Sequence, residues 1–158
     1  MDYKIVEKEA FKVMGISKKF KYEDAFAEIP KFWQEHFQNG GGEKVCGMYG
    51  VNLDEKMGMS EFEYIIADDY SEEKGVPASC VTREFPALTW AVFPCKGAMP
   101  DSMQSVNKKI FSEWLPNCRD YEIAFGCNIE MYDDPCKFSK GTQDENYYSE
   151  IWIPVKKK

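Results

Sequence analysis

The sequence predicts an α+β domain of antiparallel strands that carry helices on one face. The order strand, helix, strand, strand occurs twice, over about residues 1–70 and 78–158, and leaves few residues for parallel crossovers. Neither half could bury both faces of its own strands, so the halves are expected to pack together about a pseudo-twofold axis. A length of 158 residues is typical of one domain, and we expect a single domain over residues 1–158.

The first repeat opens with one or two strands between Tyr3 and Phe20, in which Gly15 is expected to form a bulge or bend. An amphipathic helix follows, with apolar residues at three- and four-residue spacing until glycines 40–42 end it. Pro30 lies inside this pattern, which leaves open whether the regular helix begins only there. Strands are predicted at about 45–53 and 62–67, joined by a turn over 54–60. An acidic linker is predicted over 68–77.

The second repeat follows the same order. Its predicted elements are a strand over 87–95, a loop over 97–100, a helix from Pro100 that ends at Pro116 and Asn117, a strand over 123–132, a polar loop over 133–146 and a last strand over 147–155. Residues 62–66 align with residues 149–153, so that Glu63 corresponds to Glu150. Two such units would leave a ligand cleft where they meet. A chance likeness between short amphipathic elements is the alternative.

Composition argues against several classes of function. A net charge of −7, with Arg83 and Arg119 as the only arginines, opposes binding to nucleic-acid phosphates. The six cysteines form no CxxC pair and His36 is the single histidine, so the thiols are expected to be free and neither a metal nor a cofactor is predicted. No apolar run approaches the roughly twenty residues of a membrane span. Without a recognisable signal segment, a cytoplasmic location is expected.

Aromatic residues make up 15% of the chain, more than a core of this size needs, which favours an aromatic ligand pocket. In the last strand a period of two places Tyr148, Glu150 and Trp152 on one face, and the aliphatic residues on the face expected under the helices. A carboxylate among aromatic rings costs several kcal/mol unless it is paired or protonated. Glu150 is therefore predicted to bind the ligand. An edge strand with Glu150 in water is the alternative interpretation.

The pocket walls are predicted from aromatic residues that keep a polar edge. Tyr49, Trp90 and Tyr132 each lie in a strand beside small or polar residues, whereas Trp33 and Trp114 lie on helical stripes that are more typical of a core. The predicted ligand-binding residues are Glu150, Tyr49, Trp90, Trp114, Tyr132, Tyr148, Trp33 and Phe125.

Catalytic motifs are mostly absent from the sequence. With His36 as the only imidazole, no Ser-His-acid triad can form, and neither a GxGxxG motif, a phosphate loop nor an HExxH motif occurs. The protein is therefore predicted not to be an enzyme. Hydrolysis of a reactive electrophile stays an alternative, because burial shifts a carboxylate such as Glu150 toward a basic role.

Several stretches of the sequence carry a family resemblance. They are Thr89-Trp90-Ala91-Val92-Phe93 with Lys96-Gly97, Glu113-Trp114-Leu115-Pro116, residues 129–135, the final stretch Tyr148-Ser149-Glu150-Ile151-Trp152-Ile153-Pro154-Val155-Lys156, and in the first half Cys46-Gly47-Met48-Tyr49 with Phe62-Glu63-Tyr64. In these stretches the sequence resembles the GyrI-like, or AraC-type effector-binding, domain family. The final stretch is the most specific.

The resemblance implies two pseudo-symmetric β-α-β-β units with a ligand cleft between them, in which the glutamate matching Glu150 is the central acid. Members are often fused to a DNA-binding domain and sense lipophilic cations or other drugs. This sequence begins with a predicted strand and so resembles the stand-alone members. Some of these look like drug-sequestering or gyrase-inhibiting proteins, and others resemble hydrolases of strained natural products.

Three functions follow as hypotheses. The first is a sensor or sequestering protein for an amphipathic or cationic small molecule, without direct binding to nucleic acid or membrane. The second is a hydrolase of electrophilic small molecules with Glu150 as general base. The third is a gyrase-inhibitor-like protein whose acidic surface mimics DNA, with a regulator or gyrase as its protein partner.

Overall fold

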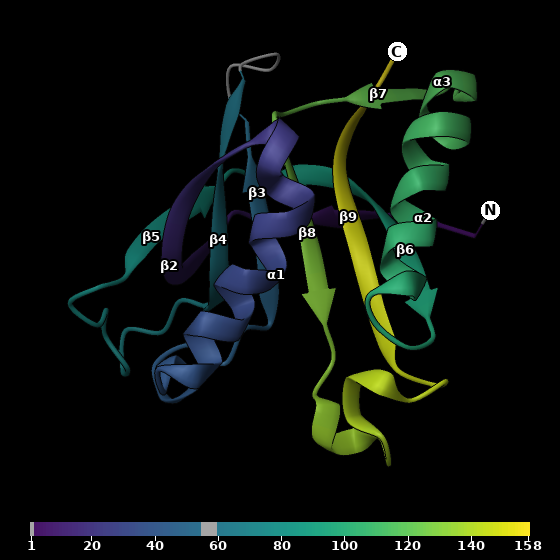
Figure 1. The fold of residues 1–158 in the computed structure, drawn as a ribbon. Helices are drawn as coiled ribbons and strands as arrows, with labels where there is room; N and C mark the ends of the chain where they lie inside the picture. Colours follow the sequence, from purple (N-terminus) through teal and green to yellow (C-terminus); the bar gives the residue numbers. More distant parts are fainter. Residues whose placement is uncertain (1, 55–59) are drawn as a thin grey trace.

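The computed structural model describes residues 2–54 and 60–158. The strands in these residues form one continuous antiparallel sheet in the order β1-β6-β9-β8-β3-β4-β2-β5, with β7 paired to β9. The strands are β1 Lys4–Lys8, β2 Phe11–Lys21, β3 Tyr49–Leu53, β4 Glu61–Asp69, β5 Val81–Phe85, β6 Leu88–Lys96, β7 Tyr121–Ile123, β8 Cys127–Tyr132 and β9 Tyr148–Lys157. Figure 1 shows the sheet with its helices in front.

The strand order is symmetric about the β3–β8 pair. One unit consists of β2, α1, β3 and β4, and the other consists of β6, α2, β8 and β9. Each unit is preceded in the chain by a strand that pairs with the opposite unit. Strand β1 pairs with β6 of the second unit, and β5 pairs with β2 of the first. The predicted α+β class, the antiparallel pairing and the two related units are confirmed.

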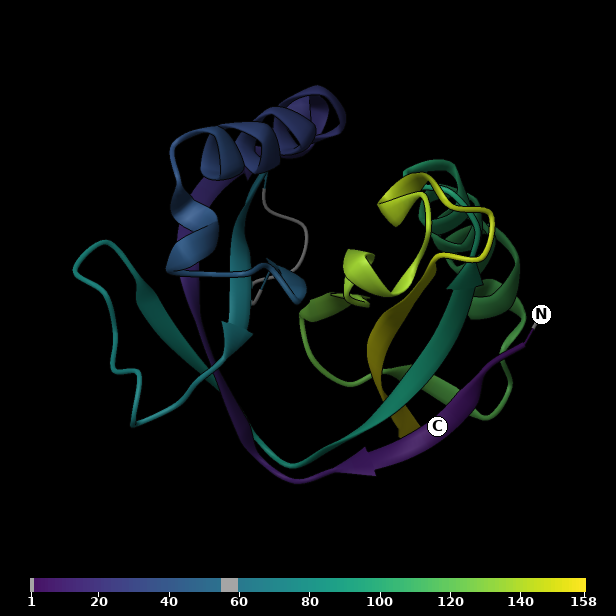
Figure 2. The ribbon, with the colours of Figure 1, turned by 90° about the horizontal axis from the view of Figure 1, so that it is seen from below.

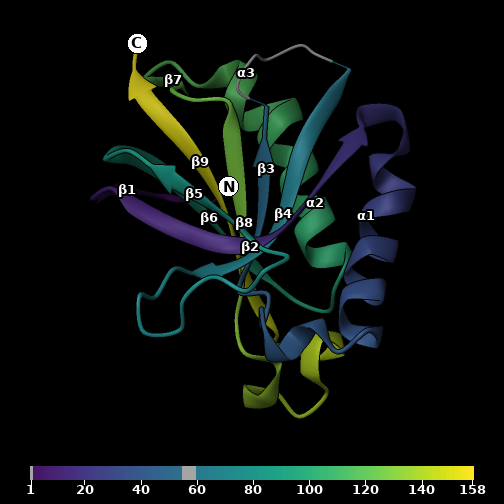
Figure 3. The same ribbon diagram turned by 90° about the vertical axis from the view of Figure 1, so that its left-hand side faces the viewer.

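Both main helices pack on the same face of the sheet, here called the helix face (Figures 2 and 3). Helix α1 (Tyr22–Gln38) packs on β2 and β4. Helix α2 (Asp101–Lys109) packs on β6 and β9 and continues through a π-helical turn, Ile110–Trp114, into α3 (Leu115–Asn117). The predicted end of this segment at Asn117 is confirmed.

Several sequence-based expectations differ from the structure. The strand expected at 45–53 begins only at Tyr49. The question left open at Pro30 is decided, since helix α1 begins at Tyr22 and the proline lies in its interior, because apolar packing on the sheet outweighs the hydrogen bond that proline cannot make. The linker starts later than expected, since β4 extends to Asp69. Strand β5 was not predicted. The strand expected at 123–132 is two strands, β7 and β8, which both pair with β9. The predicted turn over 54–60 lies mostly outside the described residues.

Alternation along the strands divides the core into three parts. On the helix face, one cluster under α1 contains Phe32 and Ile66, and a second under α2 contains Ile110 and Ile151. The third cluster fills the opposite face, where the strongly curved sheet brings its two sides together around Trp90, which is fully buried. As predicted, the aliphatic residues of the last strand lie under a helix, α2.

No helix among residues 2–54 and 60–158 combines the length and the apolar character needed to cross a membrane. In the same part of the chain, no group of three or more histidine, cysteine or acidic side chains lies close enough together to hold a metal ion.

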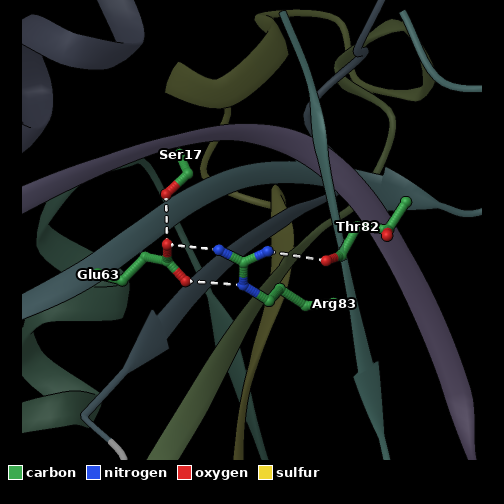
Figure 4. Close-up of polar contacts among 4 residues, drawn as sticks. All are labelled: Ser17, Glu63, Thr82 and Arg83. Carbon is green, nitrogen blue, oxygen red and sulfur yellow. Dashed lines mark hydrogen bonds and ion pairs between the residues drawn. The ribbon is translucent and has the colours of Figure 1, made fainter.

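Glu63 holds the edge strand β5 through an ion pair on the opposite face (Figure 4). The Arg83 guanidinium donates from Nε to Glu63 Oε1 at 3.0 Å and from Nη2 to Oε2 at 2.8 Å, and the Ser17 hydroxyl donates to Oε2 at 2.7 Å. Burial alone would raise the pKa of Glu63, but the hydrogen bonds from Arg83 and Ser17 hold it below its ordinary value of 4.5.

We expect Arg83→Met to make the protein less stable at neutral pH by about 0.5–1 kcal/mol, since solvent screens the partly exposed guanidinium. A lowered carboxylate pKa stabilises the fold above the unfolded-state pKa, and this contribution disappears as the pH falls through the folded-state pKa. Urea unfolding should therefore separate wild type from variant at pH 7 and bring them together below pH 4.5. An equal difference at both pH values would contradict this assignment.

Candidate functional site

The central strands β3 and β8 lie between the two helices, because α1 packs on β2 and β4 while α2 packs on β6 and β9. On the helix face these central strands carry polar side chains. Asn52 comes from β3, and Asn128, Glu130 and Tyr132 come from β8. Cross-strand pairing of Glu130 with Ile151 and Gly50 fixes its direction toward the helices. A polar strip therefore separates the two apolar cores of the helix face.

Four side chains form a hydrogen-bonded group in this strip, here called the Glu130 cluster. The hydroxyls of Tyr64 and Tyr132 both donate to Glu130 Oε1, at 2.7 and 2.8 Å. The indole of Trp33, from α1, donates from Nε1 to the Tyr64 hydroxyl oxygen at 2.9 Å. The rings of Trp33 and Tyr132 meet edge to face, with 5.3 Å between their centroids. The cluster thus joins α1, β4 and β8 around one carboxylate.

Glu130 has no basic partner within the described residues. Burial of the carboxyl group raises its pKa above the ordinary value of 4.5, and hydrogen bonds from Tyr64, Tyr132 and the Asn52 amide offset this only in part. Burial and the nearby Glu130 charge raise the pKa of both tyrosines well above 10.0, so their hydroxyls remain donors. The carboxylate therefore has three donors from the protein, the two phenols at Oε1 and the Asn52 amide. Since an ionised carboxylate offers about four acceptor sites, it can still accept a hydrogen bond from another molecule.

Gly50 provides the space for this arrangement. A Cβ atom at position 50 would lie 2.2 Å from the Tyr64 hydroxyl oxygen and 2.4 Å from Glu130 Oε1. Glycine is therefore needed in β3 so that the tyrosine and the glutamate can meet above the strand.

Glu150 lies on the opposite face of the sheet. Its Oε2 accepts a hydrogen bond from the Tyr148 hydroxyl at 2.5 Å, and its Oε1 accepts one from Trp152 Nε1 at 2.9 Å. In residues 2–54 and 60–158, no lysine or arginine forms an ion pair with it. Strand β9 lies between β6 and β8 rather than at an edge, and Glu150 is half-buried. Both carboxylate oxygens thus already have a donor from the protein.

The structure distributes the predicted site residues over three places. Trp33 and Tyr132 belong to the Glu130 cluster. Trp114 lines a surface hollow of about 550 Å³ at the end of the α2–α3 segment, together with Tyr3 and Arg119. The remaining residues belong to the opposite face. Tyr49 and Trp90 lie in its core and Phe125 packs against that core. Tyr148 and Glu150 lie beside it.

The hydrogen bonding of Tyr49 and Trp90 differs from what the sequence indicated. The Tyr49 hydroxyl donates to Asp69 Oδ1 at 3.1 Å, and burial, followed by the Asp69 charge, raises its pKa. Trp90 Nε1 is buried without a hydrogen-bond partner among the described residues. The wet aromatic edge expected at Trp90 is therefore a sealed indole in the core.

Sequence reasoning missed Glu130 and Tyr64 as site residues. Both fall in strands that were recognised, but a period of two does not say which face of a strand meets the helices. The usable signal was Gly50, because a glycine within a strand often marks a close approach by another group.

The chemistry of the cluster suits recognition of a cation. It combines a carboxylate that has no positively charged partner among residues 2–54 and 60–158 with the half-buried rings of Trp33 and Tyr132, and aromatic faces attract cations by about 0.5–2 kcal/mol each.

Comparison with known proteins identifies the family of the chain. Residues 4–155 match the family described as Cass2, integron-associated effector-binding protein. The transcriptional regulator BrlR of Pseudomonas aeruginosa is 29% identical over 165 residues, which cover 98% of this chain and 56% of BrlR. The chain thus spans little more than half the length of this relative.

Solved structures share the fold. SAV2435 bound to tetraphenylphosphonium superposes with a TM-score of 0.82 at 23% identity and covers 99% of this chain and 94% of its own. An integron cassette protein from the mobile metagenome of Vibrio cholerae gives 0.72 at 17% identity, over 98% of this chain and 95% of its own. The resemblance to effector-binding domains is confirmed, and the chain belongs to the family of integron-associated effector-binding proteins.

Proposed function

We propose that this protein binds a small lipophilic organic cation at the Glu130 cluster. The observation that carries the proposal is a carboxylate with a raised pKa that accepts two tyrosine hydroxyls at one oxygen and has no basic partner in the described chain. A bound cation would supply the missing positive charge, and the half-buried rings of Trp33 and Tyr132 would supply aromatic contacts, while the fully buried Tyr64 would hold Glu130 in place.

The comparisons support a cationic ligand by analogy. SAV2435, whose fold this chain shares, carries tetraphenylphosphonium in its structure. The matching family is described as effector-binding and BrlR as a transcriptional regulator, which favours binding over catalysis. We therefore propose a sensor or sequestering role in the cytoplasm, and a protein partner such as a regulator remains part of this proposal.

Glu150 stays the alternative ligand carboxylate, with Tyr148, Tyr49, Trp90, Trp114 and Phe125 as its predicted surroundings. It is less suited to the role because it faces away from both helices, on the side of the sheet opposite to Glu130. If the protein were instead a hydrolase, an acid with a raised pKa beside two phenols, such as Glu130, would be a better general base than Glu150.

Tryptophan fluorescence with tetraphenylphosphonium as the probe tests the proposed function. Trp33 contacts two residues of the cluster, so we expect saturable quenching of its fluorescence. The dissociation constant should lie in the micromolar range, which corresponds to a binding free energy of about −8 kcal/mol. The quenching should be reduced in Trp33→Phe. Tetraphenylmethane derivatives without charge serve as the control and should bind far more weakly. Equal binding of neutral and cationic probes, or no saturation, would overturn the proposal.

A further inference from the structure

A pair of asparagines lies beside the Glu130 cluster on the helix face. Asn52 of β3 and Asn128 of β8 face each other across the two central strands, and Asn52 Nδ2 donates to Asn128 Oδ1 at 2.9 Å. Asparagine is depleted in strands, which favour β-branched and aromatic side chains. Two asparagines facing each other at the centre of a sheet are therefore not explained by the stability of the strands.

The pair leaves hydrogen-bonding capacity unused. One donor and one acceptor are spent in the contact between the two amides, and within residues 2–54 and 60–158 no other hydrogen bond reaches the Asn128 amide nitrogen or the Asn52 amide oxygen. Because the Asn52 amide also donates to Glu130, its nitrogen and oxygen are assigned, and so are those of Asn128, which leaves one donor group and one acceptor group side by side. Both side chains are half-buried, so these groups are held at a surface between the helices.

The Asn52–Asn128 pair lies close to Glu130 on the helix face. Asn128 precedes Glu130 by two residues on the same face of β8, a separation of about 7 Å. The Asn52 amide also stabilises the charged form of Glu130, so the amides and the carboxylate adjoin. Across the symmetric β3–β8 pair, Asn52 occupies the position in β3 that Glu130 occupies in β8.

We infer that the ligand carries a carboxamide-type group about 7 Å from its cationic centre, which the Asn52–Asn128 pair binds while Glu130 binds the charge. A primary amide presents one donor and one acceptor side by side, which matches what the pair leaves open. This inference rests on the proposed function. It narrows the ligand from any lipophilic cation to a cation with a second, hydrogen-bonding end.

A matched pair of probes tests the inference, benzyltriphenylphosphonium and the same cation with a carboxamide at the para position of the benzyl ring. We expect wild type to bind the carboxamide probe about tenfold more tightly, because the amides meet partners that they otherwise lack. Asn128→Leu should reduce this preference to within about twofold and leave benzyltriphenylphosphonium binding unchanged or tighter. Asn107→Leu, at an exposed position on α2, is the control and should keep the full preference.

Asn128→Thr provides a second variant with a β-branched side chain suited to a strand, in case leucine perturbs the fold. It should also lose most of the preference. No preference in wild type, or a preference that survives in both Asn128 variants, overturns the inference while the proposed function stands. If neither probe binds wild type, the proposed function fails instead.

Discussion

Glu130→Gln is expected to weaken tetraphenylphosphonium binding about thirtyfold, since removing one partner of a partly buried charge pair costs about 2 kcal/mol or more. Glutamine still accepts hydrogen bonds from Tyr64 and Tyr132 through its carbonyl oxygen, so the cluster should remain assembled. The loss should therefore reflect the charge rather than the shape of the site. Fluorescence titration measures it directly.

Stability provides an independent check on the same variant. Burial raises the pKa of Glu130, so the folded state disfavours its ionised form, and this contribution makes the fold less stable as the pH rises through that pKa. A neutral glutamine removes the penalty, and thermal unfolding of Glu130→Gln at pH 7 should occur at or above the wild-type temperature. If Glu130→Gln bound weakly because it was unfolded, its unfolding temperature would lie below that of wild type.

Glu150→Gln is the matched control, because it changes an acid of the same length on the neighbouring strand but on the opposite face. We expect its affinity for tetraphenylphosphonium to stay within about twofold of wild type. If Glu150→Gln loses binding and Glu130→Gln keeps it, the ligand carboxylate is the one predicted from the sequence.

The pH dependence of binding has a definite sign. A bound cation favours the ionised carboxylate, so protonation of Glu130 competes with binding. Because the pKa is raised, affinity should begin to fall at a higher pH than the ordinary value of 4.5 would give, and it should fall further as the pH decreases. In Glu130→Gln this dependence should disappear.

Gly15→Ala is expected to destabilise the protein by about 3 kcal/mol or more, which is the upper range for forcing extra atoms into a packed core. A Cβ atom at position 15 would lie 2.0 Å from the carbonyl oxygen of Ile66 and 2.7 Å from the Cα of Ala67. These are backbone atoms of the neighbouring strand β4, so no side-chain rotation can relieve the contact. The β2–β4 pairing itself would have to shift.

Urea unfolding compares this variant with Gly42→Ala, in which the new Cβ atom would meet only the Phe37 ring, Cδ1 at 3.3 Å and Cε1 at 3.5 Å. The Phe37 side chain is exposed and can move, so the control should change stability by about 0.5 kcal/mol at most. Equal stability of Gly15→Ala and wild type would mean that β2 and β4 are not as close as described.

Local sequence patterns determined most of the secondary structure. The three- and four-residue spacing of apolar side chains predicted α1 and the α2–α3 segment, and the alternation in the last strand correctly placed its aliphatic residues under a helix. The boundaries that differed depend on partners distant in the sequence. Strand β5 exists as the partner of β2, and β7 and β8 are separate because each pairs with its own part of β9.

The sequence by itself determined the α+β class, the two related units, the family resemblance and the expectation of an aromatic site with an acid. Only the tertiary structure decided which groups surround each of the three glutamates. Glu63 forms an ion pair with Arg83 from another strand. Glu150 accepts hydrogen bonds from Tyr148 and Trp152, which are close in sequence. Glu130 accepts a hydrogen bond from Tyr64, which in turn accepts one from Trp33, and both lie far from Glu130 in the sequence. The physical reason is that the free energy of a buried charge depends on what surrounds it in space, and strand pairing sets those surroundings.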